Sequence, residues 1–322
     1  MAPKAEGYTH WTRSLPLPYT NYHEAVRVRG PGYNPDRPVT DASEVNMARN
    51  SSPVLITALV LTAAIWSAAQ ETPTVRAPRS GGRRVPGSDQ QTNGNDARKV
   101  ADRAIAELVA WKTTKAKQIL NEAREQYGET PEFKAAEGLL RFNENKLQDA
   151  VDLLQAASAA APADPTAEYF KGEVLLSQKK PDAARAAWTT SRDRAKALTT
   201  AQPKNAHAQY FLGAALIRHE QPAPARTALV VAAQEGFDRR MTGYQTGLSR
   251  ILEKQWNQAV DALSAVIALD DRFAPAYFYR GLAWSKLNRK DLMIDDLTRF
   301  LALAPSAPES DTARALTAAF AG

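Results

Sequence analysis

The chain has 322 residues, contains no cysteine and carries a formal net charge of +6. The absence of cysteine excludes disulfides and thiolate metal sites. The basic excess is spread along the chain rather than gathered into the stripe that is typical of nucleic-acid-binding proteins, so we expect no nucleic acid among its partners.

Residues 1–46 are rich in Pro, Tyr, Arg and Asp and show no hydrophobic periodicity, which predicts a disordered leader. The segment 47–69 is different. After Arg49 it has an uncharged, almost continuously apolar stretch that ends in the small residues Ser67-Ala68-Ala69, the pattern of a secretory signal peptide. Because such a signal begins near the start of a chain, we predict that Met47 is the natural start and that 1–46 is upstream sequence or an added extension. Cleavage near Ala69 would then export the protein to the periplasm or the medium.

Two other interpretations of the apolar stretch 53–69 stay open. Its length is at the lower limit for crossing a bilayer, so it could be an uncleaved anchor, the only route by which we expect the chain to contact a membrane. More arginines follow it than precede it, and as an anchor it would therefore leave the following residues in the cytoplasm. It could also be a buried helix. Under every interpretation residues 70–95, rich in Pro, Gly, Ser, Gln and Arg, are predicted to be a flexible linker.

From residue 96 to 322 the sequence repeats itself. Glycines recur with gaps of 34, 41, 34 and 34 residues, a small residue follows twelve positions later, and a large apolar residue follows four positions after that. The glycines are Gly138, Gly172, Gly213, Gly247 and Gly281; the small residues are Ala150, Ala184, Ala225 and Ala259, with Met293 in the last unit; the large residues are Leu154, Trp188, Leu229, Leu263 and Leu297. The same register continues back to Ala104, Ala116 and Leu120. A fixed period of this length predicts an array of one supersecondary unit, here two helices joined by a short turn.

The period of 34 with Gly, then Ala at +12, an apolar residue at +16 and Pro at +24 resembles the tetratricopeptide repeat (TPR) family. The resemblance covers 96–322 and implies an all-α fold, an α-solenoid or right-handed superhelix of about six TPR-like helix pairs with a C-terminal capping helix. It departs from the family pattern in most units, because the large residue four positions before the glycine is missing and an aromatic residue stands three before it. The resemblance is to exported or envelope TPR proteins of a bacterial type.

Two segments of the array have predicted structures of their own. The gap of 41 places seven extra residues after Trp188, about two helical turns, which predicts a lengthened second helix that projects from the middle of the array. Residues 310–320 are predicted to form the capping helix, with Ser310 as its N-cap and Asp311 in its first turn.

The resemblance also implies a concave groove lined by the first helix of each pair. The candidate groove residues stand three before or one after the glycine: Tyr169, Tyr210, Tyr244, Phe278, Leu139, Glu173, Ala214, Leu248 and Leu282. They could dock an extended or helical peptide. The alternative is that the aromatic residues replace the missing large residue of the family pattern and belong to the core.

No catalytic, cofactor or metal pattern is present in the sequence. His207 and His219 are predicted to be solvated and too far apart to share a metal ion, and Asp291, Asp295 and Asp296 are predicted to lie on a solvent-facing helix surface. We therefore expect a non-enzymatic scaffold, without cofactor, that binds a protein or peptide on its concave face. The alternative is a membrane-tethered accessory factor for the assembly or secretion of an envelope complex.

Overall fold

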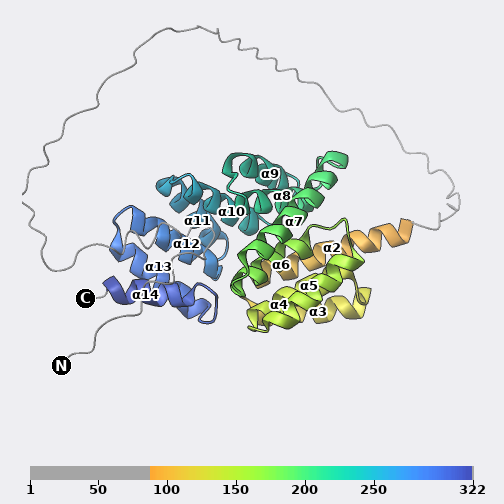
Figure 1. Cartoon of the computed structure of the whole chain (residues 1–322), viewed down its shortest axis with the longest axis horizontal. Coiled ribbons are helices and arrows are strands. Elements are labelled where there is room, and N and C mark those ends of the chain that lie inside the picture. The colour runs from red at the N-terminus through yellow and green to blue at the C-terminus, as the bar shows by residue number, and fades with distance from the viewer. Residues whose placement is uncertain (1–87, 321–322) are drawn as a thin grey trace, which may run out of the picture. The chain divides into compact units, whose positions relative to one another are not determined.

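The computed structural model describes residues 88–320, which fall in one compact unit (Figure 1). Within this range the chain forms thirteen α-helices and no strand. The helices are α2 (Ser88–Val109), α3 (Thr113–Tyr127), α4 (Pro131–Asn143), α5 (Leu147–Ala160), α6 (Thr166–Ser177), α7 (Pro181–Ala201), α8 (Ala206–Arg218), α9 (Pro222–Gln234), α10 (Arg239–Leu252), α11 (Trp256–Leu269), α12 (Ala274–Lys286), α13 (Lys290–Leu303) and α14 (Ser310–Phe320).

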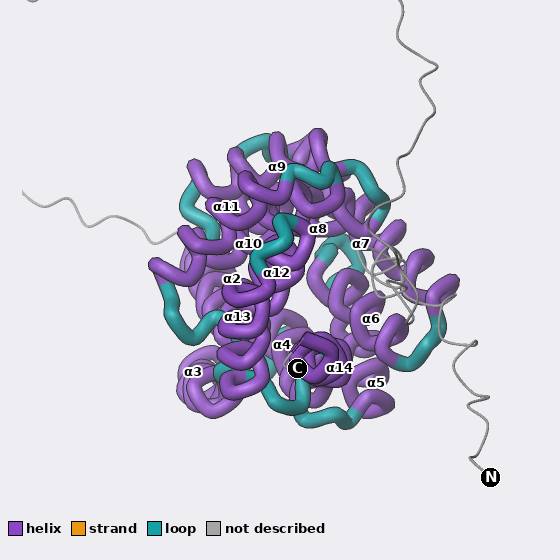
Figure 2. The backbone as a smooth tube through the Cα atoms, turned by 90° about the vertical axis from the view of Figure 1, so that its left-hand side faces the viewer, coloured by secondary structure: helices purple, strands orange, loops and turns teal. Residues whose placement is uncertain are grey.

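The helices pack in six consecutive pairs, from α2 with α3 to α12 with α13, and α14 covers the last pair (Figure 1). The first helix of each pair also contacts the first helix of the next, which produces a continuous stack. Figure 2 shows the curvature of the stack, through which α2 comes into contact with α10. The predicted fold class, an all-α solenoid of six helix pairs with a capping helix, is confirmed.

The glycines are where the two helices of a pair touch. A Cβ placed on Gly213 would lie 2.7 Å from Leu229 Cγ and 3.0 Å from the Ala225 carbonyl oxygen. A Cβ on Gly138 would lie 2.6 Å from Leu154 Cγ. The alanine backbone and the large side chain of the second helix therefore both lie against the glycine, since the large side chain points back toward the preceding turn of its own helix.

Each pair turns at a residue in the left-handed region, seven positions after the glycine or its counterpart. These residues are Trp111, Asn145, Lys179, Glu220, Lys254 and Asn288, with φ between 57° and 63°. Only two of them are asparagines, the residue type that adopts this conformation most readily after glycine. In the turn after Gly213, Gln221 N donates to the Leu216 carbonyl and so satisfies one of the free carbonyls at the end of α8. The short inter-helix turn is therefore set by backbone geometry more than by residue type.

Helix starts are fixed by side-chain caps and prolines. The Asn205 side chain accepts a hydrogen bond from Ala208 N at 2.9 Å, and Asp238 accepts from Arg240 N and Met241 N at 2.8 and 3.2 Å. Proline occupies the first turn of α4, α7, α9 and α12, where a missing N–H costs nothing. These caps orient the N-terminal ends of α8 and α10, which carry the polar contacts described below.

The lengthened helix predicted after Trp188 is confirmed. The helix α7 has 21 residues, whereas α5 has 14 and α9 has 13. Arg194, in the added turns, donates to Ser158 Oγ at 3.0 Å and to the Asp164 carbonyl at 3.1 Å, so the extension packs against the end of α5 and the following loop. The last turns of α7 are largely exposed.

Two predicted boundaries were wrong. The helix α2 begins at Ser88, inside the predicted linker 70–95, because no proline follows Pro86 before the end of the helix. The capping helix spans Ser310–Phe320 as predicted, but Ser310 is its first helical residue rather than its N-cap. The Ser310 hydroxyl donates to the Ala304 carbonyl at 2.9 Å and so ties α14 to the end of α13.

The leader, the signal or anchor segment and residues 70–87 of the linker lie outside the described residues, as does the proposed start at Met47. In the described range, no helix has the length and apolar character needed to cross a membrane.

Candidate functional site on the inner face of the array

The predicted groove residues are mostly buried. Tyr169, Tyr210, Tyr244 and Phe278 are between 0% and 8% exposed, and Leu139, Ala214, Leu248 and Leu282 are between 0% and 4% exposed. Glu173 is the exception, since its side chain remains 20% exposed. The four aromatic side chains are therefore packed as the core interpretation predicts. Whether any of these residues binds a partner stays a prediction.

The aromatic side chains pack against one another between neighbouring first helices. The rings of Tyr169 and Phe211 lie 5.6 Å apart edge to face, and the ring of Tyr210 stacks on Phe237 at 4.4 Å. The Gln245 amide lies 3.3 and 3.4 Å from the hydroxyls of Tyr169 and Tyr210, so one glutamine joins α6, α8 and α10. Burial raises the pKa of Tyr169 to about 12, which keeps its hydroxyl neutral at ordinary pH.

Glu173 of α6 and Arg218 of α8 form a partly exposed ion pair. Arg218 Nε and Nη2 donate to Glu173 Oε1 and Oε2 at 2.8 and 2.6 Å, the two-point geometry that makes Arg–carboxylate pairs strong. The guanidinium carbon of Arg218 lies 5.4 Å from the centre of the Trp188 ring, within reach of a cation–π interaction. The pair thus joins α6 to α8 and stands over the indole contributed by α7.

The environment of this ion pair is aromatic and poorly hydrated. Burial raises the pKa of the Glu173 carboxyl, and the Arg218 charge acts in the opposite direction. The hydroxyls of Tyr169, Tyr244 and Tyr279 lie near enough to Arg218 to interact with its charge. Arg218 is 13% exposed at its side chain, so both charges retain a limited contact with solvent. A guanidinium and a carboxylate in this position can recognise polar groups of a ligand.

A second polar cluster surrounds His207, at the N-terminal end of α8. Asp102 Oδ1 lies 2.9 Å from His207 Nδ1, and Thr166 Oγ1 lies 2.9 Å from Nε2. Arg98 donates to Glu132 at 2.7 Å and also pairs with Asp164, which faces His207. The prediction that His207 is solvated was wrong, because the curvature of the stack brings α2 against the ends of α4, α6 and α8.

The charge state of His207 follows from these neighbours. Burial lowers its pKa, but the carboxylates of Asp102 and Asp164 outweigh burial and raise the pKa to about 9. His207 is therefore protonated at neutral pH. Burial would raise the pKa of Asp164, but its hydrogen bond to His207 and the charges of His207 and Arg98 hold it far below the usual range. The cluster is a set of ion pairs that fastens α2 to three other helices.

The other predicted polar residues divide between exposed and buried positions. Asp291 is 63% exposed, as expected, but Asp296 is 6% exposed and accepts two hydrogen bonds from Arg280 at 2.8 and 2.7 Å. The prediction for Asp296 was wrong because its position on α13 faces α12. His219, just after α8, is partly buried, and burial lowers its pKa. The described residues contain no group of histidines and acids that could hold a metal ion.

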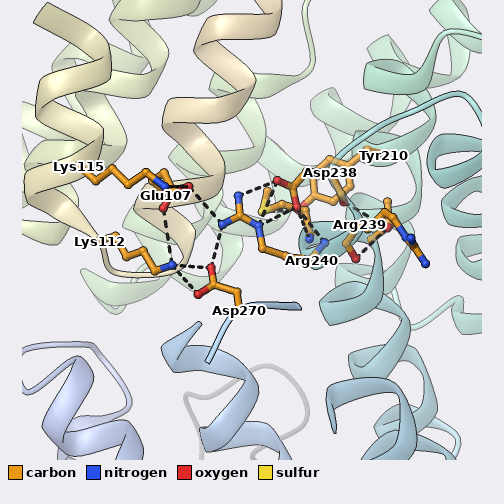
Figure 3. A network of polar contacts seen from close by, with 10 residues as sticks. Glu107, Lys112, Lys115, Tyr210, Asp238, Arg239, Arg240 and Asp270 are labelled. Carbon is orange, nitrogen blue, oxygen red and sulfur yellow. Dashed lines mark hydrogen bonds and ion pairs between the residues drawn. The ribbon is translucent and has the colours of Figure 1, made fainter. Parts of the chain in front are cut away.

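A third polar cluster joins the first helix pair to the fifth (Figure 3). Lys112, in the turn after α2, contacts Asp270, which precedes α12, at 2.5 and 2.6 Å. Arg240 at the start of α10 donates to Asp270 at 2.8 Å and to Glu107 of α2 at 3.2 Å. Sequence reasoning could not find these contacts, since the paired residues are up to 158 positions apart.

The comparisons with known proteins agree with the repeat architecture. A family model described as tetratricopeptide repeat matches residues 135–191, which include the two units built on Gly138 and Gly172. No curated protein is significantly similar to the chain.

Several solved structures are similar to the chain at low sequence identity. TTC0263, a thermophilic TPR protein of Thermus thermophilus, is 17% identical with a TM-score of 0.47, and the match covers 60% of this chain and 99% of that one. YrrB, described as a TPR protein with an unusual peptide-binding site, is 19% identical with a TM-score of 0.33, over 61% of this chain and 97% of YrrB. The protein pilF of Pseudomonas aeruginosa is 16% identical with a TM-score of 0.34, over 69% and 98%.

Proposed function

We propose that this array of helix pairs, two of which match a tetratricopeptide repeat model, is a non-enzymatic scaffold that binds a protein or peptide partner on the inner face of the array, around Glu173 and Arg218. Proteins built from this repeat are generally scaffolds for other proteins. The exposure of the ion pair supports this location for the binding site. The side chains of Glu173 and Arg218 are 20% and 13% exposed, whereas their neighbours are almost fully buried.

The chemistry of this pair defines what a partner can offer. Arg218 has five N–H donors and the Glu173 carboxylate occupies two of them, so further donors remain for carbonyl or carboxylate oxygens of a partner. The Trp188 indole and the surrounding tyrosines supply an apolar floor, where an interaction with a charged group is stronger than in water. Hydrogen-bonding peptide backbone together with one aromatic or aliphatic side chain fits this surface.

Affinity capture from the native host tests the proposal with a matched pair of variants. Arg218→Ala removes the inner-face guanidinium, and Arg226→Ala removes a similar one on α9 that pairs with Glu253 at 2.7 Å with comparable exposure. We expect the Arg218 variant to lose the captured partner while the Arg226 variant retains it, at a temperature at which circular dichroism shows that both variants are folded. Equal capture by both variants would place the partner elsewhere on the array.

We also propose delivery out of the cytoplasm through the apolar stretch 53–69, with cleavage near Ala69. The alternative is an accessory factor of an envelope complex that stays tethered by this stretch; the arginines that follow the stretch would then keep the repeats in the cytoplasm. Fractionation separates the two. A soluble form that lacks 47–69 supports export, and retention of the whole chain in membranes supports the tether.

A further inference from the structure

The polar cluster around Asp270 joins parts of the array that are distant in sequence. Glu107 and Lys112 come from the first helix pair, Arg240 begins the fifth pair, and Asp270 precedes the sixth (Figure 3). Consecutive pairs of a solenoid contact only their neighbours when the stack is open. These contacts therefore close the stack on itself.

We propose that the first helix pair is a strap that closes the array over its inner face, and that the ion pairs of Glu107 and Lys112 with Arg240 and Asp270 are the fastening that opens and closes. This inference concerns access to the inner face and stands whether or not Glu173 and Arg218 bind the partner.

The fastening is well formed in the closed state. Lys112 Nζ contacts both oxygens of Asp270, and the side chains of Glu107 and Asp270 are only 6% and 7% exposed. Arg240 is held in place by Asp238, the N-cap of its own helix, through contacts of 2.7 to 3.2 Å. Lys115 adds a further contact to Glu107 at 3.1 Å. Three acids and three bases meet here, so the closed cluster is electrically balanced.

The composition of the fastening makes reversible opening feasible. In a buried ion pair the attraction between the charges has to offset the loss of hydration of both groups. Such a pair therefore adds little net stability compared with an apolar interface. Glu107 Oε2 has no hydrogen-bond partner among the described residues, which adds a cost to the closed state. In contrast, within the first pair Ala104, Ala116 and Leu120 are buried in a continuous apolar core. The first pair can therefore stay folded while its contact with α10 and the end of α11 breaks.

The polar cluster around His207 supports the same proposal. At the other end of the described part of α2, Arg98 and Asp102 contact Glu132, Asp164 and His207 through ion pairs and hydrogen bonds. The side-chain contacts that α2 and Lys112 make with α8, α10 and the end of α11 thus include ion pairs at both ends of the strap. Loss of the Lys112 and Arg240 contacts would leave this second cluster as a hinge.

The absence of cysteine allows the distance across the fastening to be measured directly in the full chain. Thr114→Cys on α3 and Ala268→Cys on α11 place spin labels at two exposed positions on either side of it. The test compares Lys112→Met/Arg240→Met, which removes both cations, with Lys112→Arg/Arg240→Lys, which keeps them. The Arg226→Ala variant, away from the fastening, is a second control.

We expect the methionine variant to shift the distance distribution to longer distances, and the charge-conserving and Arg226 variants to keep the distance of the parent. Added salt should move the parent in the same direction, although less, because buried pairs are screened weakly. A methionine variant that keeps the parent distance would overturn the proposal.

Hydrogen exchange separates opening from unfolding. In the methionine variant, amides of α2 and of the N-terminal turn of α10 should exchange on the order of 100- to 1,000-fold faster, the factor expected when a buried charge loses its partner, while α9 and α13 keep their protection. Equal acceleration in every helix would mean that the cluster holds the whole fold together, and this result would also overturn the strap.

Discussion

The indole of Trp188 lies directly against Gly172, so closely that a Cβ on Gly172 would come within 2.3 Å of Trp188 Nε1. The two residues belong to the two helices of one pair, sixteen positions apart, and the same relation recurs at each glycine of the array. Each of the last five pairs therefore depends on one glycine, and a side chain from the next helix fills the space that a side chain on this glycine would occupy.

Gly172→Ala should destabilise the protein by about 1 to 3 kcal/mol, because the indole would have to leave its rotamer or the helices would have to separate. The direction of the change in stability is informative, since a Gly→Ala substitution in an ordinary helix interior stabilises by about 1 kcal/mol. Gly281→Ala is the matched control. Its Cβ would lie 3.2 Å from Leu297, which can move slightly, so this change should be close to neutral. The free energy of unfolding of both variants is measured by urea denaturation. Equal losses of stability in the two variants would contradict the packing of Trp188 against Gly172.

His207 should make stability depend on pH. Its folded pKa is raised to about 9 by Asp102 and Asp164, whereas in the unfolded chain it titrates near 6.5. The folded state therefore binds the proton more tightly, and the contribution is fully present below pH 6.5 and is lost as the pH rises toward 9 and beyond. Its size is on the order of 3 kcal/mol, from 1.36 kcal/mol for each pKa unit.

The measurement is the free energy of unfolding between pH 6 and pH 10. The parent should lose stability across this range, and His207→Gln should show a flatter profile with lower stability at pH 6. A parent profile that is flat, or that rises with pH, would contradict the protonated state assigned to His207.

The positive φ of the turn residues gives a third prediction. Lys254 has φ of 59°. Lys254→Gly should stabilise the protein by about 1 kcal/mol. A residue with a side chain is destabilised by about 1 to 2 kcal/mol in the left-handed region, and glycine is not. The larger conformational entropy of glycine in the unfolded chain offsets only part of this gain. Lys196→Gly, in the exposed part of α7, should instead destabilise by about 0.5 to 1 kcal/mol. Thermal unfolding distinguishes the two, and a loss at Lys254 would count against the turn geometry.

The pair of Arg280 and Asp296 gives a fourth prediction. Arg280→Ala leaves Asp296 buried without its partner, and removal of one member of a buried pair costs about 3 to 5 kcal/mol. Since burial already raises the pKa of Asp296, lowering the pH should restore part of the loss in this variant by protonating the carboxyl. Arg289→Ala removes an exposed guanidinium that pairs with Asp291, and it should leave the unfolding midpoint unchanged. Similar losses in both variants would show that burial of the pair is unimportant.

The sequence contains the information for the helix pairs because that information is local. The sixteen-residue spacing of Gly172 and Trp188 and the extra residues after Trp188 lie within one unit, and the structure confirms what each predicts. The contacts of His207 with Asp102, and of Lys112 with Asp270, depend instead on the curvature accumulated over several pairs. No pattern in a single sequence gives that curvature, so His207 looked like an ordinary surface histidine.

In the candidate site, too, the sequence predicted the local features but not the contacts between repeats. The period located Tyr169, Glu173 and Tyr210 on the first helices, and the family resemblance assigned them to the inner face. Burial of the tyrosines depends on how tightly neighbouring first helices approach, which the sequence does not reveal. Arg218, the partner of Glu173, went unnoticed because it lies in the next repeat, 45 positions away.

Site-specific photo-crosslinking in the native host tests the central claim most directly. A photo-reactive residue at Ser177, one helical turn after Glu173 on the same face of α6, is compared with one at Ala156, an exposed position on α5. We predict that the Ser177 probe crosslinks to one defined protein and that Arg218→Ala abolishes this product, while the Ala156 probe does not capture it. Capture of that protein from Ala156 but not from Ser177 would contradict binding on the inner face.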